Sequence, residues 1–168
     1  SAIPSTTTQG AASTGGSYAR FGSLVNFSGA NTFAGNITLG TNAAILINSG
    51  SLNLTGNLNG GANAGIVHRG TGNLTLSGSL ATSLGVIKGR DTSDSGTLTF
   101  NGASKATYTG NIEVNGGVFS ISDESQLGAT SNQLTLNGGT LQTSGVYTSS
   151  RVIGVGPLGA GFDISPAS

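Results

Sequence analysis

The chain has 168 residues and no formal net charge at pH 7, and only 7% of its residues are charged, compared with about 25% in typical globular proteins. Six Lys and Arg residues spread over this length do not form the basic cluster that a nucleic-acid duplex or an anionic lipid surface requires, so we expect neither partner. The absence of Cys excludes a disulfide framework and a thiolate metal site.

Residues 1–21 are rich in Ser, Thr, Ala and Gly and show little alternation of apolar and polar residues. This composition fits either a flexible leader or a strand that caps or joins the next domain. The segment contains no apolar core of a signal peptide, and no run in the chain is long and apolar enough for a membrane helix. We therefore expect that the chain does not insert into a membrane. We also expect that the protein is exported and that its signal peptide has been removed.

From residue 22 to residue 168 we predict one β-domain. Short segments in which Leu, Ile, Val or Phe alternate with Thr, Asn or Ser are typical of half-buried strands, and no helical period is sustained. Residues 28–31 are predicted to form a turn. The strands are predicted at residues 24–27, 37–39, 44–47, 52–54, 65–67, 74–76, 85–87, 98–100, 112–114, 118–121, 134–136 and 151–153.

Two all-β architectures compete for this pattern. Asn-Gly pairs at 59–60, 101–102, 115–116 and 137–138 suit the hairpins of an antiparallel sandwich, but they equally suit the corners of a solenoid. A longer echo relates NTFAGNITL (31–39) to ATYTGNIEV (106–114), and its spacing fits four coils of roughly nineteen residues. We therefore predict a parallel β-helix of about 7–8 coils (rungs), in which Asn side chains at the corners share hydrogen bonds between coils.

Residues 96–145 resemble the autotransporter-associated β-strand repeat. The likeness rests on Tyr108-Thr109-Gly110, on Asn115-Gly116-Gly117-Val118, on the acidic loop 123–128 and on the closing strands 134–141, and residues 22–56 match more loosely. The resemblance implies a right-handed parallel β-helix (β-solenoid) from a bacterial secreted or surface protein, often a passenger region exported through an outer-membrane barrel.

Few residues offer catalytic or ligand-binding chemistry. Gly154–Gly159 fits the pattern G-x-G-x-x-G, but Pro157 opposes the helix that a dinucleotide site needs, so we predict a glycine-rich turn. His68 is the only histidine and has no nucleophilic-serine motif or set of metal ligands to join. We expect His68 to lie at the surface or in a turn.

The carboxylates gather in two places. Asp91 and Asp94 lie beside Lys88 and Arg90, and Asp123-Glu124 form the second cluster. Paired acids serve glycosidases and calcium sites, yet six acids and no Trp are few for a saccharide-cleaving face. We predict solvated loops at both clusters, no catalytic, cofactor-binding or metal site, and no enzyme.

One interpretation of the aromatic residues is a platform on which sugar rings stack. Phe27, Phe100 and Phe119 alternate with other apolar residues, so we expect them in the core instead.

The function that follows is structural. We expect an extracellular β-solenoid at the bacterial cell surface, which serves as a stalk or as a filament subunit that self-associates end to end, since open ends expose unpaired strand edges. Residues 1–21 are candidates for the joint. The alternatives are an adhesin or glycan-binding passenger fragment, which would meet a surface glycan or host receptor through loops 88–95 or 122–132, and, less favoured, a polysaccharide-degrading enzyme.

Overall fold

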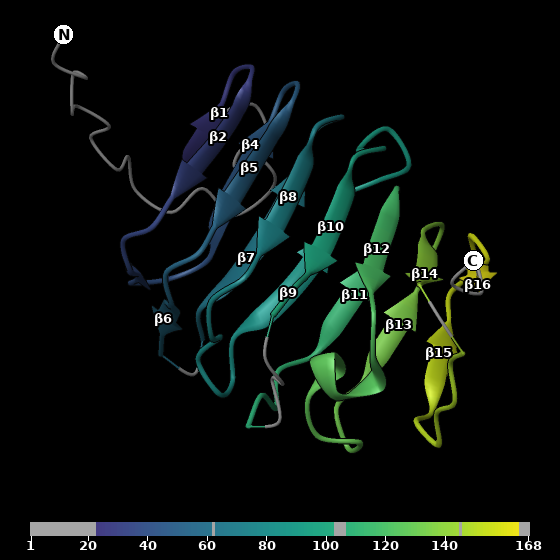
Figure 1. Cartoon of the computed structure of the whole chain (residues 1–168). Coiled ribbons are helices and arrows are strands. Elements are labelled where there is room, and N and C mark those ends of the chain that lie inside the picture. Colours follow the sequence, from purple (N-terminus) through teal and green to yellow (C-terminus); the bar gives the residue numbers. More distant parts are fainter. Residues whose placement is uncertain (1–22, 62, 103–106, 145, 165–168) are drawn as a thin grey trace, which may run out of the picture.

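The computed structural model describes residues 23–61, 63–102, 107–144 and 146–164, and in this part the strands stack as a parallel β-solenoid (Figure 1). Each coil, meaning one full turn of the chain, contributes one strand to each of two seven-stranded parallel sheets. The described part makes about six turns, whereas 7–8 are predicted for residues 22–168. The predicted fold class, an all-β parallel solenoid, is therefore confirmed, with fewer coils than predicted.

Sheet 1 and sheet 2 run side by side along the stack, from β1 and β2 at one end to β15 and β16 at the other (Figure 1). Sheet 1 contains β1 (Leu24–Asn26), β4 (Ala43–Ile47), β7 (Gly65–Arg69), β9 (Gly85–Lys88), β11 (Ile112–Val114), β13 (Leu134–Leu136) and β15 (Ile153–Val155). Sheet 2 contains β2 (Ala30–Phe33), β5 (Ser51–Leu54), β8 (Asn73–Leu76), β10 (Thr97–Phe100), β12 (Val118–Ile121), β14 (Thr140–Thr143) and β16 (Gly161–Ile164). The first two coils add the pair β3 (Ile37–Leu39) and β6 (Leu58–Gly60).

The core forms because like residues lie above one another in register. In sheet 2, Leu52 pairs with Leu74, Leu74 with Leu98 and Leu98 with Phe119, and all four are buried. Fully burying one such side chain contributes about 1.5–3 kcal/mol, so each coil is stabilised mainly by the coils above and below it. Phe100 adds an edge-to-face contact with Phe119, at a centroid separation of 4.8 Å.

The predicted regular spacing of nineteen residues is wrong. Paired residues are separated by as few as 19 positions, as for Leu134 and Ile153, and by as many as 26, as for Val86 and Ile112. The long echo therefore does not superpose, because Ile37 lies in β3 whereas Ile112 lies in β11 of sheet 1. Insertions at the corners change the coil length while the strands keep their register.

Some strand limits also differ from the prediction. Ala30 and Asn31 begin β2 instead of forming a turn, and β15 begins at Ile153. The strands β2 and β6 each carry one large apolar residue, Phe33 and Leu58, so alternation did not indicate them. The strand β16 was also not predicted, although Phe162 and Ile164 alternate in it. In the described ranges the helical content is one short 3-10 helix, η1 (Glu124–Leu127), which agrees with the predicted near-absence of helix.

Asparagine side chains link successive coils, as predicted. Asn36 Oδ1 accepts the backbone N–H of Asn57 at 2.9 Å, and Asn57 Oδ1 accepts that of Ser79 at 3.1 Å. Among the described residues, a direct amide–amide bond between two coils joins Asn137 Nδ2 to Asn115 Oδ1, at 3.4 Å. These asparagine side chains therefore mostly accept hydrogen bonds from backbone N–H groups of the next coil.

Within the residues that the structure describes, no helix is both long enough and apolar enough to span a membrane.

Candidate functional site

The outward face of sheet 2 carries a column of hydroxyl and amide side chains that ends in one carboxylate, Asp163. Outward residues pair in register from coil to coil, at the roughly 4.8 Å spacing of neighbouring strands. The column consists of Thr32, Asn53, Thr75, Thr99, Ser120, Gln142 and Asp163. This face is hydrophilic yet nearly uncharged, so it favours water without attracting a strongly charged partner.

The longest described corner between the two sheets lies between β9 and β10. Most corners between sheet 1 and sheet 2 span three residues, as at 48–50, 70–72 and 115–117, whereas the corner between β9 and β10 spans residues 89–96. Its tip, residues 90–93, is exposed, and Asp94 behind it is 4% exposed. We call residues 89–96 the corner loop.

Asp94 fastens the corner loop to the preceding coil. Its Oδ1 accepts the backbone N–H of Gly70 at 2.8 Å, and its Oδ2 accepts that of Arg90 at 2.9 Å and the Nε of Arg69 at 3.3 Å. Burial acts to raise the pKa of Asp94, but these donors outweigh burial and hold that pKa below its ordinary value. Asp94 is therefore a structural carboxylate, and the prediction that it lies in a solvated loop is wrong.

Asp91 lies at the exposed tip. Its Oδ1 accepts the backbone N–H of Ser93 at 2.9 Å and the Ser93 hydroxyl, and these bonds lower its pKa. Asp91 and Asp94 thus hold separate turns of the loop.

Two basic side chains, a histidine and a lysine, lie inside the solenoid. His68 and Lys88 are both 0% exposed and pair in register between Ile45 and Val114, in a column that points into the core. The prediction of a surface or turn histidine is therefore wrong. The alternation was visible, because Ile66 and His68, like Val86 and Lys88, lie two positions apart and so share a strand face. The strands were predicted to end at 67 and 87, which is two residues before the end of β7 and one residue before the end of β9.

Their environments shift both pKa values downward. Burial, and secondarily the charge of Lys88, lowers the pKa of His68 to about 3, and neither ring nitrogen has a hydrogen-bond partner. Burial lowers the pKa of Lys88 to about 8, while its Nζ donates to the backbone carbonyl of Asp94 at 2.5 Å. A neutral imidazole therefore lies against an amine that covers the base of the corner loop.

The second acidic cluster is also structural. Asp123 Oδ1 accepts the N–H of Ser125 at 2.8 Å and caps η1. Glu124 accepts the Nε of Arg151 at 3.0 Å and the hydroxyl of Tyr147 at 2.5 Å, and burial followed by Glu124 raises the pKa of Tyr147 to about 12. Sequence reasoning missed Arg151, whose guanidinium also binds three carbonyls of the preceding coil, those of Gly128, Ala129 and Asn132.

A polar hollow of about 470 Å³ lies beside this cluster. It is lined by Thr130, Ser131, Asn132, Gln133, Ser150, Val152 and Gly154. Three of its lining residues, Thr130, Ser131 and Asn132, belong to loop 122–132, the second loop predicted for adhesion.

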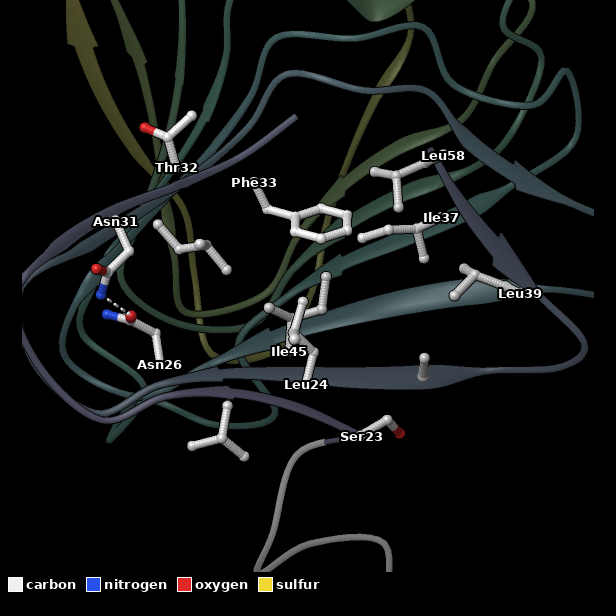
Figure 2. A pocket seen from close by; sticks show the side chains of 13 residues that line it. Ser23, Leu24, Asn26, Asn31, Thr32, Phe33, Ile37, Leu39, Ile45 and Leu58 are labelled. Atoms are coloured by element: carbon white, nitrogen blue, oxygen red, sulfur yellow. Dashed lines mark hydrogen bonds between the residues drawn. The ribbon is translucent and has the colours of Figure 1, made fainter. Parts of the chain in front are cut away.

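A second, apolar hollow of about 480 Å³ lies at the end of the stack that β1 and β2 form. Phe33, Ile37, Leu39 and Leu58 point into it, with Leu24 and Ile45 below them (Figure 2). At its other side Asn31 Nδ2 donates to Asn26 Oδ1 at 2.6 Å (Figure 2).

The aromatic residues follow the prediction in part. Phe100 and Phe119 lie in the core as predicted, but Phe27 is 75% exposed, because Asn26 takes the inward position and turns the next residue outward. Tyr108 is buried and donates to the carbonyl of Leu84 at 2.7 Å.

Gly154 and Val155 end β15, and Gly156–Gly159 form a turn closed by a backbone bond of 3.0 Å, so no dinucleotide-type helix opens there. Among residues 23–61, 63–102, 107–144 and 146–164, no three His, Asp or Glu side chains gather closely enough to hold a metal ion. The proposed joint 1–21 lies outside the described residues.

The chain is similar to the adhesin BmaC autotransporter of Brucella suis biovar 1 (strain 1330), with 34% identity over 108 residues. The match covers 64% of this chain, and it spans about 3% of the length of that relative. No family model matches the chain, and no solved structure matches it. The likeness thus links the solenoid to an autotransporter adhesin, while the autotransporter-associated repeat stays a prediction.

Proposed function

We propose that this chain is an exposed passenger segment of a bacterial cell-surface protein, and that its solenoid serves as a non-catalytic stalk. With about 4.8 Å per coil, about six turns hold the two ends roughly 29 Å apart. The observation that carries the proposal is the in-register parallel stack, whose outward column on sheet 2 is hydroxyl- and amide-covered and whose core is continuous. The likeness to an autotransporter adhesin supports the surface location.

Surface labelling tests this proposal. An antibody raised against the purified chain should label intact cells of the bacterium that produces it, and mild external protease should remove the signal. A cytoplasmic protein of the same cells serves as the unlabelled control. Labelling that requires permeabilised cells would contradict the surface role.

We propose adhesion as a second role, because the corner loop places a charged tip on a body that has little other charge. Arg90 and Asp91 project there, and the bonds of Asp94 hold the loop to the coil below. A surface glycan or a host receptor is the partner class that such a loop on an autotransporter-like passenger would meet. The polar hollow near Gln133 is a further contact surface of the same kind.

The adhesive role is tested by replacing the corner loop with the short Asn-Gly-Gly corner found at 115–117. On a glycan array and on cultured host cells, the replacement should abolish binding, and Gln142→Ala on the outward face of sheet 2 should leave binding unchanged. Equal binding by the parent chain and the loop variant would contradict the role of this loop. Polysaccharide cleavage that Asp91→Ala abolishes would contradict the non-catalytic assignment.

A further inference from the structure

The two basic side chains inside the solenoid hold the corner loop from within. The Nζ of Lys88 donates to the backbone carbonyl of Asp94 at 2.5 Å, and a Cβ at Gly117 in the next corner would lie 2.8 Å from this Nζ. His68 pairs with Lys88 from the preceding coil. The backbone carbonyl of His68 accepts the N–H of Gly89, the first residue of the corner loop, at 2.9 Å. The corner loop is therefore attached to the core where the buried His68–Lys88 pair lies.

The surroundings of His68 do not compensate a positive charge. The imidazole is 0% exposed, and neither ring nitrogen has a hydrogen-bond partner within the described part of the chain. Its neighbours in the column are Ile45 and Lys88, and the charged groups that act on it are Lys88 and Asp94. Lys88 has a pKa of about 8, so it is charged at neutral and acidic pH, and Asp94 is already paired with Arg69. A proton on His68 would place a second buried cation beside Lys88.

The corner loop is held by polar bonds. Its residues 89–96 include no large apolar side chain, so burial of apolar surface does not anchor it. Asp94 binds the N–H groups of Gly70 and Arg90, and these bonds are the main link to the preceding coil. A segment with few buried apolar contacts opens at a lower free energy than the strands beside it. The loop can therefore open while β9 and β10 keep their places in the two sheets.

We propose that the corner loop is an acid-sensitive element, which separates from the preceding coil when His68 takes up a proton while the rest of the solenoid stays folded. The proton enters when the loop is open, because the closed core excludes water from the imidazole. In the open form, water separates the charges of His68 and Lys88 and weakens their repulsion. Asp94 does not cause the release, because its pKa lies below its ordinary value and its carboxylate stays ionised in mild acid.

The role of this release in the cell rests on the adhesive function proposed above for the corner loop. A loop that opens in mild acid no longer presents one fixed surface to a partner. Binding through the corner loop should therefore weaken as the pH falls from 7 to 5.

Amide hydrogen exchange of the full chain, followed by NMR at pH 7, 6 and 5, tests the release. The reporters are the N–H groups of Gly70 and Arg90, which Asp94 binds, and their rates are corrected for the pH dependence of exchange in unfolded peptides. The pKa of His68 is about 3 in the closed form and takes its ordinary value of 6.5 in the open form. The protection of both amides should therefore fall about 25-fold between pH 7 and pH 5. Low concentrations of denaturant should leave their exchange unchanged, because a local opening exposes little surface.

His68→Leu and a distant corner supply the controls. His68→Leu places an apolar side chain in an apolar column and should keep the protection of Gly70 and Arg90 constant from pH 7 to pH 5, with circular dichroism checking that the variant folds. The N–H of Ser79, which bonds to Asn57 Oδ1 in another corner, should keep its protection in the parent chain.

Three results would overturn the proposal. The first is protection of Gly70 and Arg90 that does not change with pH in the parent chain, and the second is an equal fall in the His68→Leu variant. The third is an equal fall at Ser79, because the whole solenoid would then be opening. The exchange measurement involves no binding partner, so the adhesive function stands or fails by the loop replacement and not by this result.

Discussion

Single residues decide how this solenoid responds to pH. His68 and Lys88 occupy positions where the neighbouring coils place Ile45 and Val114, so the core holds two basic groups that it stabilises in their neutral forms. Burying a charge without a matched partner is costly, whereas a neutral imidazole or amine is tolerated. Arg151 shows the opposite solution, because a carboxylate and three carbonyls surround its guanidinium.

Because the pKa of His68 is lowered in the folded chain, we expect the free energy of unfolding to fall in mild acid. Below its ordinary pKa of 6.5 the imidazole takes up a proton in the unfolded chain but stays neutral in the folded chain down to about pH 3, so stability falls as the pH drops through this interval. We expect the free energy of unfolding to decrease by about 2 kcal/mol between pH 6.5 and pH 5. His68→Leu should remove this decrease. Denaturant titrations at pH 7, 6 and 5 measure the free energy of unfolding of both proteins. If it falls with pH as steeply in the His68→Leu variant as in the parent chain, the role of His68 is refuted.

Because the pKa of Lys88 is lowered in the folded chain, we expect the stability to rise with pH in the alkaline range. Between pH 8 and pH 10.5 the amine is neutral in the folded chain and charged in the unfolded chain, so stability rises with pH. We expect a gain of about 2 kcal/mol between pH 8 and pH 9.5, and Lys88→Met should abolish this gain. Measurement stops at pH 9.5 because the raised pKa values of Tyr108 and Tyr147 cost stability above pH 10. The His68→Leu variant is the control and should keep the alkaline rise.

At the scale of the elements, close approach of the coils at the corners limits which residues fit there. A Cβ at Gly56 would lie 2.2 Å from the backbone oxygen of Gly35 in the preceding coil, and one at Gly78 would meet Gly56 in the same way. Glycine thus forms a column for steric reasons, just as leucine forms columns inside. The corner loop shows that a coil tolerates an insertion where an acidic side chain, Asp94, binds it to the coil below.

Substitution in the glycine column should weaken the stack. Gly56→Ala forces backbone to move against backbone, and we expect it to lower the free energy of unfolding by about 2–3 kcal/mol, as overpacking commonly does. Gly40→Ala is the matched control, because nothing lies within 4 Å of a Cβ built there. Thermal unfolding of both variants measures the difference. Equal melting temperatures would show that the corners are looser than the structure indicates.

At the scale of the whole molecule, alternation along the chain predicted short half-buried strands but left an antiparallel sandwich and a solenoid both open. The choice of parallel coils was correct, although the regular spacing of nineteen residues on which it rested is not kept by coils of 19 to 26 residues. The same alternation followed one residue further would have placed His68 and Lys88 inside. The roles of Asp94 and Arg151 were not predictable, since each depends on partners that lie in a different coil and reach it through loops of unequal length. The outward position of Phe27 followed from Asn26, a polar residue in an inward place.

The most direct measurement of the parallel, in-register stack is a set of spin-label distances in this cysteine-free chain. Labels at Thr32 paired with labels at Thr99, Ser120 or Gln142 lie three, four and five coils apart in one outward column. Pulsed electron paramagnetic resonance should give distances of about 14, 19 and 24 Å, an increase of about 4.8 Å per coil. Distances that do not increase in this order, as expected if neighbouring strands ran antiparallel, would contradict the solenoid and the stalk that depends on it.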